Sequence, residues 1–249
     1  MRKGLYIGTT LLIIITVGTF YFTRDHSQSI ISSQLPAINT PIVSTLAPIP
    51  TPTLPPSHLI NTMFVPQAPE NKWNEPWQDT CEEAALLTVY YYHNPAIVTT
   101  KEIKTALEQL IEYENNNGFG ADISIEQMGL IAQKSLKLKP IIISDPTIEE
   151  LKSYLSRDLP IIIPANGKIL YLENHNFNNF GPYYHNIVLL GYDDTIQKFT
   201  VHDVGTRHGA YFIYSYQLLM DSIHDFPPDL HKENINNGPK KVLILEKML

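Results

Sequence analysis

The fold and the chemistry of the chain are decided by one stretch, Trp77-Gln78-Asp79-Thr80-Cys81-Glu82-Glu83-Ala84-Ala85-Leu86-Leu87. It contains the only cysteine among 249 residues, and apolar residues follow at helical spacing. Thr80 followed three residues later by Glu83 matches the capping-box pattern, which predicts that a helix begins at Cys81. Unpaired backbone N–H groups at a helix start favour thiolate over thiol and could hold an oxyanion. The stretch therefore predicts a thiol nucleophile.

Two carboxylates directly after the cysteine oppose this prediction. Glu82 and Glu83 suit the positive end of the helix dipole, but negative charges beside a thiol disfavour its ionisation. A reactive Cys81 therefore needs a cationic partner from elsewhere in the chain, and histidine is the obvious candidate. The alternative is that Cys81 is a small buried apolar residue, as most unpaired cysteines are.

The amino-terminal segment predicts a membrane anchor. Met1-Arg2-Lys3 precedes a run from Leu5 to Phe22 that contains no charged residue. A span of the bilayer core needs about 20 mainly apolar residues. The positive charges ahead of the run place the amino terminus in the cytoplasm, and no small-x-small cleavage site follows the run. We expect residues 1–26 to be a cytoplasmic tip and a retained signal anchor in the cell membrane, with the remainder of the chain extracytoplasmic.

Residues 27–59 have the composition of a spacer. The segment from Ser27 to Ser57 is rich in serine, threonine and proline and contains no charged residue. Such a segment buries too little apolar surface to offset its ordering entropy, so we expect an extended stalk. Residues 60–249 then form one domain, which is long enough to bury a normal core.

The composition argues against several classes of protein. A single cysteine allows no intrachain disulfide. The net charge of -7 and the lack of a lysine and arginine cluster argue against a nucleic-acid surface. His175, His202 and His208 with Asp203 could be metal ligands, but strand alternation places His202 and Asp203 on opposite faces. We expect a monomer without metal or cofactor.

Helical patterns come first in this domain and strand patterns later. Helices are predicted at the Cys81 stretch, at 101–114, from Ser124, from Thr147 and at 215–224. Short apolar runs bounded by proline or turn residues predict strands at 140–143, 160–163, 186–192, 199–203, 210–214 and 242–245. Helices grouped on one side of a mainly antiparallel sheet make this an α+β domain.

Two of the predicted strands bring a histidine and an aspartate together. His185 opens one strand and Asp203 closes the next. If residues 193–198 form a hairpin turn, the two residues lie no further apart than a diagonal pair, roughly 7–8 Å between backbones. A carboxylate can then hold one imidazole nitrogen while the other faces a thiol, which would outweigh Glu82 and Glu83.

Several short segments resemble a known family when they are taken in order. They are Val65-Pro66-Gln67-Ala68-Pro69, Gln78-Asp79-Thr80-Cys81-Glu82-Glu83-Ala84, Gly181-Pro182-Tyr183-Tyr184-His185 and His202-Asp203-Val204-Gly205-Thr206-Arg207. Together they are similar to papain-like cysteine peptidases, and in particular to bacterial extracytoplasmic domains related to the bacteriocin-processing (double-glycine leader) peptidases. The resemblance covers Val65 to about Asp225.

The resemblance implies a fold, an activity and site residues. It implies a papain-like fold in which Cys81 is the nucleophile, His185 the general base and Asp203 the orienting residue. The glutamine that donates to the oxyanion is either Gln67 or Gln78, because Glu75 stands where papain-like enzymes have this glutamine. The expected function is a membrane-anchored cysteine peptidase acting on a peptide or protein substrate. The alternatives are a cell-wall amidase or transpeptidase, and a non-catalytic binding module on the same fold.

Overall fold

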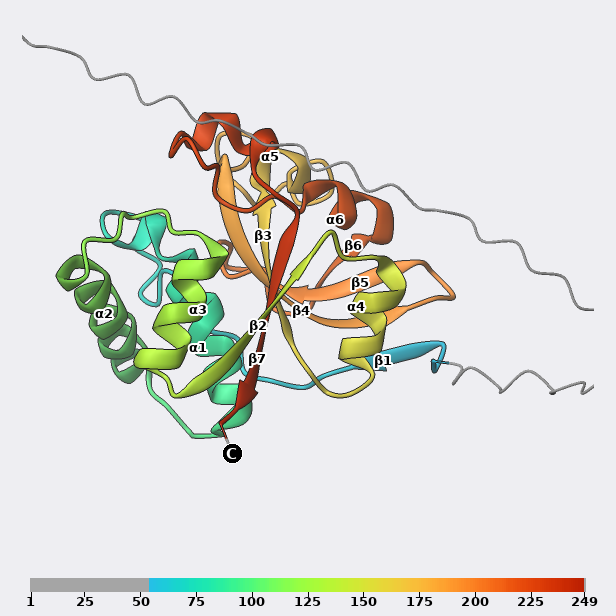
Figure 1. Cartoon of the computed structure of the whole chain (residues 1–249), viewed down its shortest axis with the longest axis horizontal. Coiled ribbons are helices and arrows are strands. Elements are labelled where there is room, and N and C mark those ends of the chain that lie inside the picture. Colours follow the sequence, from blue (N-terminus) through green and yellow to red (C-terminus); the bar gives the residue numbers. More distant parts are fainter. Residues whose placement is uncertain (1–53, 249) are drawn as a thin grey trace, which may run out of the picture. The chain divides into compact units, whose positions relative to one another are not determined.

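A computed structural model of the chain describes residues 54–248. The predicted anchor, and the predicted stalk up to residue 53, lie outside the described residues. Within 54–248 no helix combines the length and the apolar character that crossing a bilayer would require. The described residues form helices and one antiparallel sheet, so the predicted α+β class is confirmed (Figure 1).

Three helices near the amino end of the domain form one group (Figure 1). They are α1 (Cys81–His93), α2 (Thr100–Asn116) and α3 (Ile125–Lys134). Capping boxes start α2 at Thr99 and α3 at Ser124, because a side chain three residues on returns the hydrogen bond of each cap. The group packs against three strands of the sheet, β2 (Leu138–Ser144), β4 (Tyr184–Asp193) and β7 (Lys241–Lys247).

The start of α1 differs from the prediction in one respect. The helix begins at Cys81 after Thr80, as expected, but Thr80 makes no side-chain cap. The reason is a 3-10 turn, η1 (Trp77–Asp79), which leads directly into α1, so that the Thr80 hydroxyl donates to the Pro76 carbonyl instead. The Glu83 side chain is 2% exposed and turns toward α2, so the capping box predicted here is wrong.

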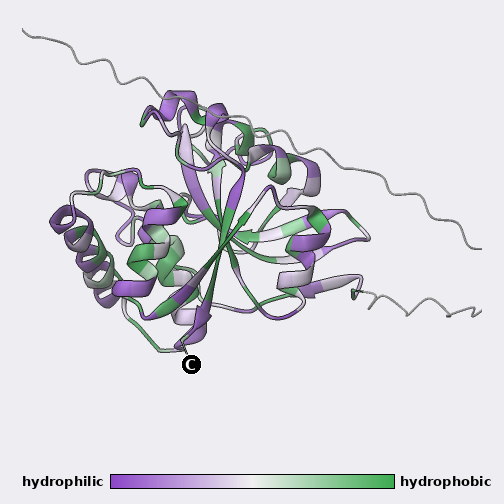
Figure 2. Ribbon diagram, in the orientation of Figure 1, coloured by the Kyte–Doolittle hydropathy of each residue, from purple (hydrophilic) through white to green (hydrophobic). Residues whose placement is uncertain are grey.

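Seven strands form a single sheet in the order β2-β7-β3-β4-β5-β6, with β1 paired to β4. The strands after β1 are β2 (Leu138–Ser144), β3 (Ile161–Asn166), β4 (Tyr184–Asp193), β5 (Lys198–His202), β6 (Phe212–Ser215) and β7 (Lys241–Lys247). All pairs are antiparallel. Every residue of β3 is buried, which requires both faces of the central strands to be covered. Figure 2 shows hydrophobic residues concentrated where these strands cross.

The remaining helices lie on the other side of the strands from the first group (Figure 1). They are α4 (Ile148–Leu155), α5 (Gly167–Leu170) and α6 (Tyr216–Ser222), and they contact β3, β4, β5 and β6. Helices therefore do not all group on one side as predicted. The single turn α5 and the 3-10 helix η2 (Lys232–Asn237) were not predicted, since neither has a periodic apolar face.

The amino-terminal boundary of the domain also needs a correction. Ser57–Leu59, assigned to the stalk from composition, form β1 and pair with Gly191 to Asp193 of β4. The physical reason is that β3 covers this edge of β4 only as far as Leu189, which leaves the next backbone groups free to pair. Gly191 permits the close approach, because a Cβ there would lie 2.4 Å from the His58 carbonyl oxygen.

The predicted hairpin of β4 and β5 is confirmed. Val188 faces His202 and Leu189 faces Val201, and the register shifts by one residue at a bulge before Gly191. The strand carrying His185 and the residue that follows β5, Asp203, are thereby held next to each other at the centre of the sheet.

Candidate active site

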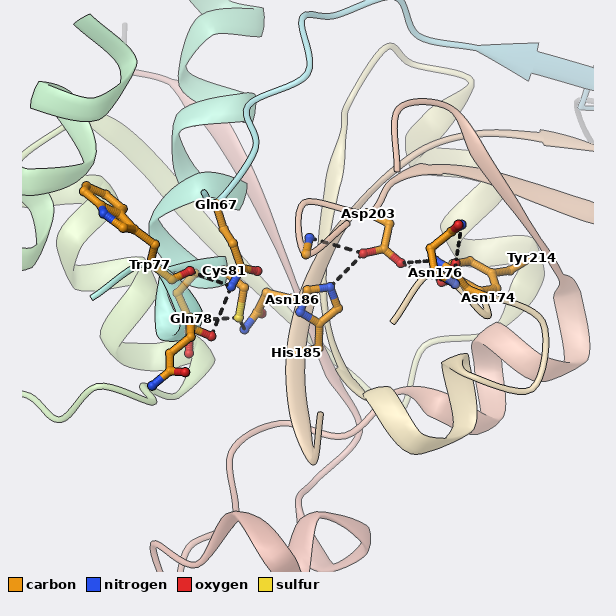
Figure 3. Close-up of polar contacts among 12 residues, drawn as sticks. Gln67, Trp77, Gln78, Cys81, Asn174, Asn176, His185, Asn186, Asp203 and Tyr214 are labelled. Carbon is orange, nitrogen blue, oxygen red and sulfur yellow. Dashed lines mark hydrogen bonds and ion pairs between the residues drawn. The ribbon is translucent and has the colours of Figure 1, made fainter. Parts of the chain in front are cut away.

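A cleft of about 450 Å³ lies where the start of α1 meets the sheet. Its lining includes both Cys81 and His185, together with Gln67, Gln78 and Gly205. Cys81 and His185 are more than 100 positions apart in the sequence, and the fold brings them to one cleft (Figure 3).

Cys81 is the first residue of α1 and is 5% exposed. Its Sγ lies 3.0 Å from Glu82 Oε2 and 3.8 Å from Asn186 Nδ2. Burial raises the pKa of the Cys81 thiol well above its ordinary value, and an ionised Glu82 would raise it further. The thiolate expected from the helix start alone is therefore not favoured by the surroundings of Sγ.

Buried carboxyl groups surround the start of α1. Glu82 and Glu83 are 1% and 2% exposed, and burial raises the pKa of both well above the ordinary range. Glu114 of α2 faces Glu83, and burial raises the pKa of Glu114 to about 7. The sequence analysis missed Glu114, although it continues the buried face of α2 after Leu107 and Leu110 and so stands at a core position.

His185 and Asp203 form a buried pair. His185 Nε2 lies 2.9 Å from Asp203 Oδ1, and the two side chains are 2% and 0% exposed. The backbone N–H of Gly205 also donates to Asp203 Oδ1. Because Asp203 engages Nε2, the nitrogen of His185 left for a thiol is Nδ1. Among the described residues no hydrogen bond joins Cys81 to His185 directly.

Two further residues hold the other oxygen of Asp203 (Figure 3). Tyr214 Oη donates to Oδ2 over 2.6 Å, and Asn174 Nδ2 donates to it over 2.9 Å. Both side chains are fully buried, and burial raises the pKa of Tyr214 above its ordinary value. Sequence reasoning missed Asn174, because its loop between α5 and β4 carries no pattern that signals a site.

The two candidate glutamines have different surroundings. Gln67 is 4% exposed, lines the cleft and donates from Nε2 to the carbonyls of Trp77 and Gln78 just ahead of Cys81. The side chain of Gln78 instead donates to the carboxylate of Glu75 on the exposed side of the loop. Figure 3 shows the Gln67 side chain next to Cys81 and the Gln78 side chain directed away from it.

Gly205 packs directly against the imidazole. A Cβ at this position would lie 2.5 Å from His185 Cε1 and 3.1 Å from Gln67 Oε1. A real Cβ does not approach another atom to 2.5 Å, so the backbone of Gly205 forms the wall that fixes the imidazole ring.

The histidines considered as metal ligands do not converge on Asp203. His202 points away from it: its Nε2 is bonded to the Thr62 carbonyl, and the backbone N–H of Tyr211 donates to its Nδ1. Within residues 54–248 no three histidine, cysteine, aspartate or glutamate side chains lie together as a metal would require.

Comparison with known proteins identifies the family. The model of the Peptidase C39 like family matches residues 63–223, which is well over half of the chain and contains every site residue named above. The chain belongs to the C39-like peptidase family. It is a cysteine peptidase with the papain-like fold.

One of two similar solved structures supports this fold. A protein described as a C39-like peptidase from Bacillus anthracis superposes with a TM-score of 0.51 and 16% identity, covering 77% of this chain and 98% of its own. Xylellain, a cysteine protease from Xylella fastidiosa, superposes with a TM-score of 0.44 and 14% identity, covering 79% of this chain and 88% of its own. No match is found among curated proteins.

Proposed function

We propose that this C39-like peptidase hydrolyses peptide bonds through a triad of Cys81, His185 and Asp203. The observation that carries the proposal is the buried His185–Asp203 pair, which opens onto the same cleft as Cys81. Asp203 fixes the imidazole by holding Nε2, as an orienting carboxylate does in other triads. Nδ1 then accepts the thiol proton, and Sγ attacks the carbonyl carbon of the substrate.

The rest of the reaction follows from this geometry. The tetrahedral intermediate collapses when the imidazolium returns its proton to the leaving amine, which breaks the C–N bond and leaves a thioester on Cys81. Water activated by His185 then releases the acid and restores the thiol. An imidazolium in the cleft also opposes the raised pKa of Cys81, because a nearby positive charge favours the thiolate.

The oxyanion is assigned to the Cys81 backbone N–H and to Gln67. Gln67 is supported because its amide nitrogen lies against the residues just ahead of Cys81, while Gln78 is engaged by Glu75. Both N–H groups of Gln67 now serve the carbonyls of Trp77 and Gln78, so donation to an oxyanion requires one of those bonds to be exchanged.

The proposed location is the outer face of a cell membrane, with the domain held by residues 1–26 through a spacer. This rests on the uncharged run from Leu5 to Phe22 and on the positive charges at Arg2 and Lys3. Fractionation of cells that express the full chain tests it. If the protein is recovered in the soluble fraction and lacks the run from Leu5 to Phe22, the segment is a cleaved signal peptide and not an anchor.

The triad is tested by the pH dependence of Cys81 alkylation with iodoacetamide, comparing the wild-type chain with His185→Ala. We expect Cys81 of the wild type to be alkylated at pH values well below the free-thiol pKa of about 8.5. The His185→Ala variant should lose this reactivity at low pH. Equal, slow reaction of both proteins at neutral pH would show that no thiolate–imidazolium pair forms. That result would favour the alternative function, a non-catalytic binding module on the same fold.

The exposed histidine at position 208 supplies a matched control, because it lines a different hollow of the surface. His208→Ala is expected to alkylate as the wild type does. Hydrolysis of labelled casein by the same three proteins then tests turnover separately from thiol reactivity.

A further inference from the structure

We propose that Glu82 is a catalytic residue: it stays protonated and donates a hydrogen bond from Oε2 to the Cys81 thiolate. The inference rests on the proposed function, in which Cys81 is the nucleophile, and adds a partner for the sulfur that the triad does not contain.

The first argument is the environment of the Glu82 carboxyl. Its side chain is buried, and no lysine or arginine within residues 54–248 makes an ion pair with it. An ionised carboxylate in such a place is costly, so the group takes up a proton instead.

The titratable groups that face Glu82 come from four parts of the fold. They are Cys81 and Glu83 on α1, Glu114 on α2, Asp122 ahead of α3 and Tyr184 on β4. None of them carries a positive charge. Lys232 also lines the cleft, but it lies 3.1 Å from Asp122 and 3.8 Å from Asp79, so it neutralises those carboxylates and not Glu82. Burial and the charge of Glu83 both raise the pKa of Glu82.

The second argument is the position of the proton. Glu82 Oε1 accepts a hydrogen bond from the backbone N–H of Ile123 over 3.3 Å, which marks Oε1 as the carbonyl oxygen of a carboxylic acid. The hydroxyl is then Oε2, the oxygen that lies 3.0 Å from Cys81 Sγ. Asn186 Nδ2, at 3.8 Å from Sγ, is a second donor on another side of the sulfur.

The proton balance of nucleophile formation follows. The S–H bond of Cys81 breaks and its proton goes to His185 Nδ1, while the O–H bond of Glu82 remains intact and turns toward the negative sulfur. The buried site then holds one imidazolium and one thiolate, and Glu82 adds no charge. When Sγ forms its bond to the substrate carbon, its negative charge moves to the oxyanion and the hydrogen bond from Glu82 weakens. In this step the thiol of Cys81 loses its proton and Glu82 keeps its own.

Two substitutions at one position separate a donor from a repelling charge. Glu82→Gln keeps a neutral donor of similar shape, whereas Glu82→Met fills the space with neither donor nor charge. The thiol pKa is measured from the pH dependence of iodoacetamide alkylation and from thiolate absorbance. Glu83→Gln is the matched control, because Glu83 is equally buried on the same turn of helix but does not contact Sγ.

We expect the thiol pKa of Glu82→Gln to stay close to the wild-type value and that of Glu82→Met to rise by about one to two units. Glu83→Gln should lower it slightly, since the charge of Glu83 raises the pKa of Cys81 without a contact to Sγ. The proposal is overturned if Glu82→Gln and Glu82→Met both lower the thiol pKa, since that is the behaviour of an ionised carboxylate that repels the thiolate.

A second measurement covers the case in which Glu82→Met does not fold. The infrared difference spectrum between wild type and Glu82→Gln at neutral pH should contain the carbonyl stretch of a protonated carboxylic acid. A carboxylate band in its place contradicts the proposal. The infrared outcome depends neither on peptide hydrolysis nor on alkylation, so a failure here is distinguishable from a failure of the His185→Ala alkylation test.

Discussion

The two sides of the cleft are built in opposite ways. On the sheet side, Asp203 accepts hydrogen bonds from His185, Gly205, Asn174 and Tyr214, so both of its oxygens are satisfied. On the helix side, by contrast, buried oxygens of Glu83 and Glu114 have no hydrogen-bond partner among the described residues.

This difference separates two tasks. A fully satisfied polar network is rigid, so the His185 imidazole has one fixed orientation. Buried carboxyl groups without cations respond to pH, so the electrostatic field at Cys81 depends on how many protons they hold. The peptidase therefore combines a histidine of fixed orientation with a cysteine whose ionisation is adjustable.

The largest expected effect comes from disturbing His185 on the sheet side of the cleft. Gly205→Ala introduces a Cβ that would lie 2.5 Å from His185 Cε1, so the imidazole must move. Because a displacement of about 1 Å can cost about a hundredfold in rate, casein hydrolysis should fall by about that factor. Gly120→Ala is the control, since its Cβ would meet nothing closer than 3.4 Å. Unchanged hydrolysis in Gly205→Ala would mean that the wall does not fix the ring.

A smaller effect, on the free energy of unfolding, is expected from the buried carboxyl groups on the helix side. Glu114 has a folded-state pKa of about 7 against an ordinary value of 4.5. The folded protein therefore binds more protons than the unfolded chain between these values, and its stability falls as pH rises through this window. The loss is complete above about pH 7 and is on the order of 3 kcal/mol.

Glu114→Gln should remove most of this slope and be more stable than wild type at pH 8. Urea unfolding at pH 5 and pH 8 measures it. Glu112→Gln, on the exposed face of the same helix, is the control and should retain the wild-type slope. If both variants retain it, the buried carboxyl pair is not the group that titrates.

The smallest expected effect comes from removing one of the hydrogen bonds to Asp203. Tyr214→Phe removes one hydrogen bond to Asp203 and leaves that of Asn174 in place. Hydrolysis of casein should fall by about tenfold, consistent with a bond to a charged group. Tyr216→Phe loses a comparable bond to Asp194, away from the cleft, and should hydrolyse casein at the wild-type rate. Equal losses in both variants would indicate a general effect on folding.

The sequence predicted the parts of this molecule that depend on local patterns. The start of α1 at Cys81, the caps of α3 and α4, and the register that joins His185 to Asp203 all follow from spacing between nearby residues. The pairing of β1 with β4 could not be predicted, because it depends on where β3 begins, about 100 residues later in the chain.

The same limit applies to the site. The contacts of Glu83 with Glu114 and of Asp203 with Asn174 join residues about 30 positions apart in segments of different type. A capping box and a buried carboxyl pair use the same glutamate, and only the neighbouring helix decides between them. Nothing in the sequence indicated that Glu75 engages the side chain of Gln78 and not that of Gln67.

The pairing of β1 with β4 has a mechanical consequence. Tension applied to the chain ahead of residue 54 would enter the domain at Ser57–Leu59, whose backbone is bonded to the last residues of β4. Because the two strands are antiparallel and lie side by side, the ladder between them is the first element to bear the load, and it ends at Gly191, six residues from His185. The hydrogen bonds between β1 and β4 would therefore resist the tension before it reached His185 near the start of β4.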